Sequence, residues 1–258
     1  MDIVGLIKIG LVEIFYSIKR MIYNFRNKTK IDKHIDKELK EKGIFIYKNF
    51  LDREETEKLI TEAEKTKKNH QESIVTESNG ADKRIYGIDL INKNFQIEKL
   101  KYLEEIPKRF YGTNEISQFI LYGEIHATER NLGSGNGWHR DSAFRPQIKF
   151  LIYLTDVGIN NGPFEYIEGT HGLISLLSQS KNTEFSKTRY SDKEIDNLLR
   201  RKNLRSKKII GNAGDMVIVN TRGLHRGSPL DIGRRVAITN YIFDQEIPKK
   251  IPLAKHIK

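Results

Sequence analysis

Apolar residues recur at helical spacing over the first thirty residues of the chain. Lys8 and Glu13 interrupt the apolar run, which argues against a signal peptide and a membrane-spanning helix. The period predicts an amphipathic, basic helix over residues 1–30, ahead of a single domain at 31–258. Two interpretations remain: the apolar stripe packs on that domain, or it contacts a membrane surface. The stripe comprises Val4, Ile7, Leu11, Ile14, Phe15, Ile18, Ile22 and Phe25.

Shorter patterns predict mixed elements over residues 33–110. Asp52, followed by Glu55 three residues later, has the spacing of a capping box at a helix start. Pro107 disturbs the end of the last helical pattern in this region. The predicted elements are a helix at 33–41, a strand at 44–47, a helix that follows Asp52, a loop at 67–83, a strand at 84–91 and a helix at 96–110.

From residue 116 the pattern changes to short β-rich runs separated by Gly, Asn and Pro. Such spacing is typical of an all-β barrel or double sheet rather than of parallel βαβ units. We therefore expect a mainly β protein with flanking helices (α+β), built on a cupin-like jelly roll at about 84–245. A helical, basic insertion at about 172–206 would interrupt it. The β-rich runs are residues 117–125, 148–154, 164–167, 215–220 and 235–243.

Composition and charge narrow the classes of function. With no cysteine in 258 residues, the chain has no disulfides, no thiolate metal sites and no cysteine nucleophile, which is typical of a cytoplasmic protein. Residues 1–30 carry a net charge of +4 and residues 198–208 one of +6, together ten of the net +11. Such patches attract phosphates, anionic lipids, acidic carrier proteins or nucleic acid. Because the sequence has no helix-turn-helix or zinc module, we expect no specific nucleic-acid binding.

The densest chemical motif is Gly137-Trp138-His139-Arg140-Asp141. Alternate residues of a strand point to the same face, so His139 and Asp141 would project together and chelate one divalent metal. His225, which follows the apolar run 216–220, is the candidate third ligand. Two histidines and one carboxylate on one octahedral face leave three positions open, as in non-haem Fe(II) oxygenases.

Arg235 lies ten residues after His225 and opens the last β-rich run. A guanidinium binds a carboxylate through two hydrogen bonds and keeps its proton, which suits the far end of a dicarboxylate co-substrate such as 2-oxoglutarate. The histidine pair, the carboxylate and this late arginine together indicate an oxygenase centre.

These blocks resemble the phytanoyl-CoA dioxygenase-like family of Fe(II)/2-oxoglutarate-dependent oxygenases. The resemblance runs from residue 40 to residue 243 and includes the segments LKEKGIFIYKNFLDREETEKLITEAE, WHRDS, IKFLIYLTDVGINNGPFEYIEGTHG, GNAGDMVIVNTRGLHRGSP and GRRVAITNY. It implies a double-stranded β-helix with helices packed outside it. It also implies that His139, Asp141 and His225 are ligands of Fe(II).

The resemblance assigns the far carboxylate of 2-oxoglutarate to Arg235. Arg234 is the alternative, but strand alternation lets only one of the two face the site, and the pattern R-x-A-I favours Arg235. Ser228 is a candidate for a further hydroxyl contact. Thr239 is another, because it lies on the same strand face as Arg235.

The implied activity is hydroxylation of an unactivated C–H bond, with O2 as co-substrate and succinate and CO2 as products. Asp141 favours this reaction, because related halogenases lack the carboxylate ligand. The basic segments suggest a small, carrier-linked or lipid-linked anionic substrate, with Trp138 and Arg145 as candidate contacts and Lys149 on a solvated rim. The alternative is a metal-binding jelly roll that senses or binds a ligand without turnover, with or without membrane contact. No pattern in the sequence indicates an oligomeric state.

Overall fold

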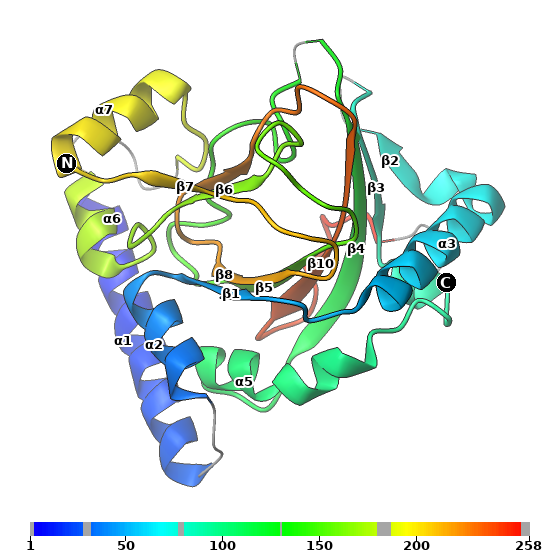
Figure 1. Cartoon of the computed structure of the whole chain (residues 1–258). Coiled ribbons are helices and arrows are strands. Elements are labelled where there is room, and N and C mark those ends of the chain that lie inside the picture. The colour runs from blue at the N-terminus through cyan, green and yellow to red at the C-terminus, as the bar shows by residue number, and fades with distance from the viewer. Residues whose placement is uncertain (1–2, 28–31, 77–79, 130, 180–186, 254–258) are drawn as a thin grey trace.

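The computed structural model describes residues 3–27, 32–76, 80–129, 131–179 and 187–253 and contains two antiparallel sheets that face each other (Figure 1). The larger sheet has the strand order β1-β8-β5-β10-β4-β3-β2, and the smaller one β7-β6-β9. The predicted jelly-roll core with flanking helices is therefore confirmed. The strands are β1 (Ile44–Tyr47), β2 (Ile74–Thr76), β3 (Asp82–Tyr86), β4 (Ser117–His126), β5 (Ile148–Tyr153), β6 (Phe164–Ile167), β7 (Ser206–Ile209), β8 (Met216–Asn220), β9 (His225–Gly227) and β10 (Arg234–Phe243).

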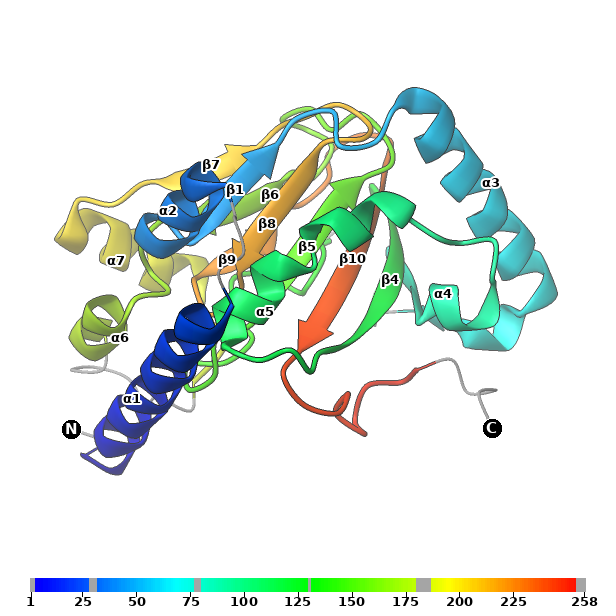
Figure 2. The same ribbon diagram turned by 90° about the horizontal axis from the view of Figure 1, so that it is seen from below.

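Helices cover the outer face of the larger sheet (Figure 2). Its central strands read as nearly continuous apolar runs because both of their faces are buried. On β10, Val236 and Ile238 face the helices, whereas Ala237 faces the smaller sheet. The helices are α1 (Ile3–Arg26), α2 (Lys33–Glu41), α3 (Arg53–Asn69), α4 (Ile88–Ile91), α5 (Glu105–Tyr111), α6 (Leu173–Gln179) and α7 (Asp192–Lys202), with 3-10 turns η1 (Gln71–Ser73) and η2 (Glu98–Leu103).

Three predicted elements differ from the structure for local reasons. The polar segment 67–83 contains the end of α3 and strand β2, whose partner β3 begins at Asp82, rather than a continuous loop. The predicted strand 84–91 ends at Tyr86, because Gly87 adopts φ +77° and opens α4. The predicted helix 96–110 is split at Glu104, and Pro107 lies in the first turn of α5, where a missing N–H costs little.

The basic insertion predicted at 172–206 contains α6 and α7, and its residues 180–186 lie outside the described part of the chain. Helix α7 begins at a capping box formed by Ser191 and Glu194. The capping box predicted at Asp52 and Glu55 is also present, at the start of α3. The proposed boundary between an N-terminal helix and a domain from residue 31 stays a prediction, because residues 28–31 are not described.

Helix α1 packs on the domain through the face opposite to the apolar stripe. Its buried residues are Gly5, Ile9, Tyr16 and Tyr23. The Tyr16 hydroxyl donates to Asp244 at 2.9 Å, and the Tyr23 hydroxyl donates to Glu105 at 2.9 Å. Helix α1 therefore packs on its own domain, as one interpretation predicts, but it does so through its less apolar face, and the stripe itself is exposed. No helix in the described residues is long and apolar enough to cross a membrane.

The ion pair between Glu13 of α1 and the buried Arg222 predicts a large stability effect. Glu13→Ala leaves a guanidinium that is only 3% exposed without its carboxylate, so we expect the free energy of unfolding to fall by about 3 kcal/mol. Urea unfolding measures this loss. Arg53→Gln is the control, because the pair Arg53–Glu57 is exposed and contributes about 0.5 kcal/mol or less. Equal losses in the two variants would contradict the assignment.

Candidate metal centre

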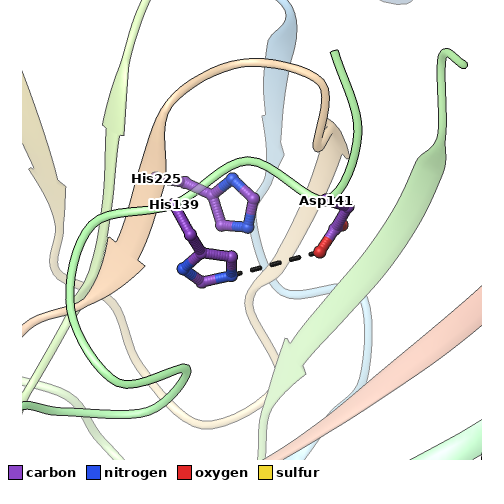
Figure 3. Close-up of side chains that lie close together, drawn as sticks. All are labelled: His139, Asp141 and His225. Carbon is purple, nitrogen blue, oxygen red and sulfur yellow. Dashed lines mark ion pairs between the residues drawn. The ribbon is translucent and has the colours of Figure 1, made fainter. Parts of the chain in front are cut away.

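Two segments that lie far apart in the sequence bring three potential ligands together (Figure 3). His139 and Asp141 lie between β4 and β5, and His225 begins β9. The backbones of His139 and His225 exchange two hydrogen bonds of 2.9 and 2.8 Å, and the Asp141 N–H donates to the Thr221 carbonyl at 3.0 Å. The three ligand atoms lie within 4.8 Å of one another, so one ion can contact all of them.

Both histidines are oriented by backbone carbonyls. Nδ1 of His139 contacts the Gly137 carbonyl at 2.9 Å, and Nδ1 of His225 contacts the Gly223 carbonyl at the same distance. A carbonyl oxygen only accepts, so each Nδ1 carries the proton and each Nε2 offers its lone pair to the centre. Burial lowers the pKa of His139, and burial together with the neighbouring His139 lowers the pKa of His225 to about 3. Both rings are therefore neutral at pH 7, as metal ligation requires.

The glycine-rich segment before the motif allows close approach to His139. Gly135 has φ +86°, and a Cβ at this position would lie 2.5 Å from Cε1 of the His139 ring. Any side chain at residue 135 would therefore displace the ligand ring as well as strain the backbone. The glycine at residue 135 therefore lets the loop support the ligand His139 at close range.

Lys149 of β5 holds the Asp141 carboxylate. Its ammonium lies 2.6 Å from Oδ2, whereas Oδ1 lies 4.0 Å from Nε2 of His139. Burial raises the pKa of Asp141, but the charge and hydrogen bond of Lys149, together with the two neighbouring histidines, outweigh burial and leave that pKa well below its ordinary value. The prediction of a solvated rim position for Lys149 is wrong: the residue is 6% exposed, and its ammonium lies 3.9 Å from the centre of the Tyr241 ring.

We expect Lys149→Met to destabilise the metal-free protein by about 3 kcal/mol, because Asp141 becomes a largely buried charge without a counter-charge. A divalent ion replaces the lost positive charge, so the metal should raise the melting temperature of this variant more than that of the wild type. Thermal unfolding with and without Co²⁺ measures both effects. Lys83→Met is the control, because Lys83 is exposed on β3. An equal metal-induced shift in the variant and the wild type would contradict the role of Lys149.

The three ligands line a cavity of about 220 Å³ that also contains four cations. Leu121, Leu151, Phe164 and Val219 form its apolar wall. An adjoining cavity of about 310 Å³ shares Asp141, Lys149 and Tyr241 with it. The cavity therefore combines a metal position with an apolar wall. The cationic side chains in its lining favour an anionic ligand. The four cations are Arg84, Lys149, Arg189 and Arg235.

Arg235 and Arg234 point to opposite faces of β10. Arg235 is 6% exposed, lines the cavity and donates to the Gly162 carbonyl. Arg234 is exposed on the opposite face of β10, where it pairs with Glu124 at 3.2 Å. Thr239 lines the cavity on the same face as Arg235. Of the two arginines, only Arg235 is placed to contact a ligand in this cavity.

Ser228 and Trp138 lie away from the cavity. The Ser228 hydroxyl donates to Glu165 at 3.1 Å, on the outer face of the smaller sheet. Strand alternation after His225 places residue 227 at the cavity and residue 228 outside it, so Ser228 does not line the cavity in which its co-substrate contact is predicted. Trp138 is 3% exposed, packs against α7 in a separate apolar cluster and does not line the cavity.

Arg145 is exposed and lines the adjoining cavity, where it contacts Gln245. Arg84 and Arg189 were missed at the sequence level. Arg84 of β3 pairs with Asp82 at 2.5 Å, and Arg189 donates to the Gly135 carbonyl at 2.7 Å beside the ligand His139. The alternation of Asp82 and Arg84 along one strand face was the available signal for the first. No sequence pattern indicated the second.

The sequence was compared with profiles of known protein families. The sequence profile of the phytanoyl-CoA dioxygenase family (PhyH) matches residues 39–231. The chain belongs to the phytanoyl-CoA dioxygenase family. The match contains all three candidate ligands, whereas Arg235 lies beyond its end. No curated protein sequence matches the chain.

Solved structures share the fold of this PhyH protein at low sequence identity. The carbocyclase SnoK from nogalamycin biosynthesis, a non-haem α-ketoglutarate-dependent enzyme, is 17% identical, with a TM-score of 0.60 over 83% of this chain and 85% of SnoK. The epimerase SnoN from the same pathway is 16% identical, with a TM-score of 0.60 over 85% and 86%. HygX from Streptomyces hygroscopicus, solved with nickel and 2-oxoglutarate, is 14% identical, with a TM-score of 0.54 over 85% and 90%.

Proposed function

We propose that this PhyH protein is an Fe(II)- and 2-oxoglutarate-dependent oxygenase. The observation that carries the proposal is one cavity that holds two neutral histidines, an ionised carboxylate and the buried guanidinium of Arg235. Two nitrogen donors and one oxygen donor on one side of an ion leave room for exogenous ligands, which suits Fe(II). HygX and SnoN, which share the fold, have been crystallised with 2-oxoglutarate or α-ketoglutarate.

The residues divide the work between metal and co-substrate. His139, Asp141 and His225 would hold iron, Arg235 would pair with the far carboxylate of 2-oxoglutarate, and Thr239 would offer a hydroxyl further along the same cavity wall. With both bound, the centre supplies the oxidising power to attack a C–H bond as 2-oxoglutarate and O2 are converted to succinate and CO2. Lys149 keeps Asp141 ionised and fixes the orientation of its carboxylate. The apolar wall limits access of water to the reacting position.

We further propose hydroxylation of a small anionic substrate, free or linked to a carrier or lipid. Asp141 keeps its place as a protein ligand, which favours return of a hydroxyl group to the substrate. Arg189 adds positive charge to the cavity beyond Arg235, whereas the charge of Arg84 is compensated by Asp82, so a second anion besides 2-oxoglutarate is favoured beside Arg189. In the fold relatives HygX and SnoN, the bound molecules are hygromycin B and a nogalamycin-related compound, both small molecules.

Formation of succinate tests the proposal. The protein is incubated with Fe(II), ascorbate, 2-oxoglutarate and O2, and phosphorylated and carrier-bound acyl compounds are screened for stimulation of succinate release. We expect stimulated release that Asp141→Ala abolishes, together with a product that has gained one oxygen atom. A product of unchanged mass would indicate epimerisation instead of hydroxylation. A product that has lost two hydrogen atoms would indicate ring closure instead. Tight metal binding with no affinity for 2-oxoglutarate would favour the non-catalytic binding protein.

A further inference from the structure

The exposed face of α1 is the largest concentration of apolar side chains on the described surface. Ten of the eighteen exposed large hydrophobic residues in the described part of the chain belong to this one helix. A continuous patch of this kind on a soluble domain marks an interaction site rather than ordinary surface. The patch, here called the α1 stripe, consists of Ile3, Val4, Ile7, Leu11, Ile14, Phe15, Ile18, Met21, Ile22 and Phe25.

The contacts on the other side of α1 hold the stripe outward. Tyr16 and Tyr23 each donate a hydrogen bond to a carboxylate of the domain, and Glu13 pairs with the buried Arg222. Lys19 adds an ion pair with Asp244 at 3.3 Å. Rotation of α1 to bury the stripe would break all four contacts and leave Arg222 without its carboxylate. Exposure of the stripe is therefore built into the packing of the domain.

Positive charge surrounds the α1 stripe. Lys8 and Arg26 are exposed on α1, and its one acidic residue, Glu13, points inward to Arg222. Helices α6 and α7 lie on the same side of the molecule as α1 in both views (Figures 1 and 2). The segment from α7 to β7 adds six exposed bases: Arg200, Arg201, Lys202, Arg205, Lys207 and Lys208.

We propose that α1 docks the protein on an anionic membrane surface, with the stripe inserted at the level of the lipid headgroups and the α7–β7 bases facing the bilayer. An apolar face with phenylalanine, flanked by Lys and Arg, is the pattern of helices that lie in a bilayer interface. A second copy fits less well, because a two-fold pairing through this side would bring like charges together. This proposal does not depend on the oxygenase chemistry.

Docking through α1 would place the metal centre close to the lipid surface. The Lys8 ammonium lies 4.3 Å from the centre of the Phe144 ring, three residues after the ligand Asp141. Asp244, which accepts the Tyr16 hydrogen bond, lines the cavity that adjoins the metal site. On the proposed oxygenase function, on which this consequence alone rests, an amphiphilic substrate held in the bilayer would then have a short path to the centre.

Vesicle binding tests the proposal with matched variants. Co-sedimentation is measured with vesicles of phosphatidylcholine alone and of phosphatidylcholine mixed with phosphatidylserine. We expect the wild type to prefer the anionic vesicles, and Leu11→Asn with Ile18→Asn to bind about tenfold less or weaker still. Ile159→Asn with Ile232→Asn is the control, because these residues are 55% and 58% exposed outside α1 and should leave binding unchanged. Lys202→Gln with Arg205→Gln and Lys208→Gln should remove the preference for phosphatidylserine.

Two further measurements distinguish binding of the α1 stripe to a membrane from its binding to a second copy of the chain. In Ile18→Trp, the added tryptophan should shift its emission to the blue with anionic vesicles, whereas Ile159→Trp should not respond. Sedimentation velocity without lipid should show a monomer. A dimer that the Leu11→Asn, Ile18→Asn variant abolishes would overturn the proposal in favour of a second copy. A monomer that ignores both vesicle types would also overturn it. Unchanged melting temperatures of the stripe variants exclude misfolding as the cause.

Discussion

His225→Ala is expected to abolish metal binding and, with it, all conversion of 2-oxoglutarate to succinate. The substitution removes one of three ligands from a centre whose remaining histidine and carboxylate lie 4.0 Å apart. Loss of a mere supporting contact weakens metal sites by about 10–100-fold, so loss of a ligand should exceed about 100-fold. Calorimetric titration with Co²⁺ measures the affinity.

His126→Ala is the matched control for this prediction. His126 is a partly exposed histidine that contacts Glu124 at 2.9 Å and does not line the cavity. Its removal should leave the Co²⁺ affinity unchanged. If His225→Ala binds Co²⁺ as tightly as His126→Ala does, the ion is held elsewhere and the assignment of the centre fails.

Arg235→Ala should raise the concentration of 2-oxoglutarate needed for half-saturation by about 100-fold, because truncation of one partner of a buried charge pair costs about 2–5 kcal/mol. Arg235→Lys should lie between this variant and the wild type, because an ammonium keeps the charge but loses the two-point contact. Metal affinity should be unchanged in both. The measurement is a titration of the metal-loaded protein with 2-oxoglutarate.

Arg234→Ala provides the internal comparison, since its guanidinium contacts Glu124 on the other face of the same strand. We expect it to bind 2-oxoglutarate as the wild type does. If Arg234→Ala greatly weakens 2-oxoglutarate binding and Arg235→Ala does not, the result would contradict the structure, in which Arg235 and not Arg234 faces the cavity.

The jelly-roll core could be predicted because its strands carry their own signal. Residues 148–153 and 216–220 are buried on both faces, so they are apolar at nearly every position. The HxD spacing likewise carries local information, because two residues apart on an extended chain face the same way. Pairing of this segment with His225 depends on the long-range contact of two backbones, which the late position of His225 only suggested.

Helix α1 shows where hydrophobic periodicity fails. The pattern identifies the most apolar stripe, and burial of that stripe is the usual outcome. Here Tyr16 and Tyr23 offer the domain both a ring and a hydroxyl, and Glu13 neutralises a buried arginine, so the less apolar face gains more from docking. The spacing of residues along α1 contains no information about its partners on the domain, which are the carboxylates of Asp244 and Glu105 and the guanidinium of Arg222.

The surroundings of Lys149 and Ser228 could not be predicted from the sequence either. A lysine in a β-rich run is expected on a solvated rim, because burial of its charge is costly unless a partner is present. Its partner Asp141 reaches it only through the fold. Ser228 directly follows β9, and one residue of strand phase decides whether its hydroxyl faces the cavity or Glu165.

The most direct test of the proposed centre is an anaerobic titration of the protein with Fe(II) and then 2-oxoglutarate, followed by visible absorption. Chelation of iron by the keto acid in this site should produce a charge-transfer band that is present in the wild type, absent in His225→Ala and formed only at much higher 2-oxoglutarate in Arg235→Ala. No band in folded, Fe(II)-loaded wild-type protein would contradict the assignment of a 2-oxoglutarate-binding iron centre, because the three ligands would then hold a metal that does not receive 2-oxoglutarate.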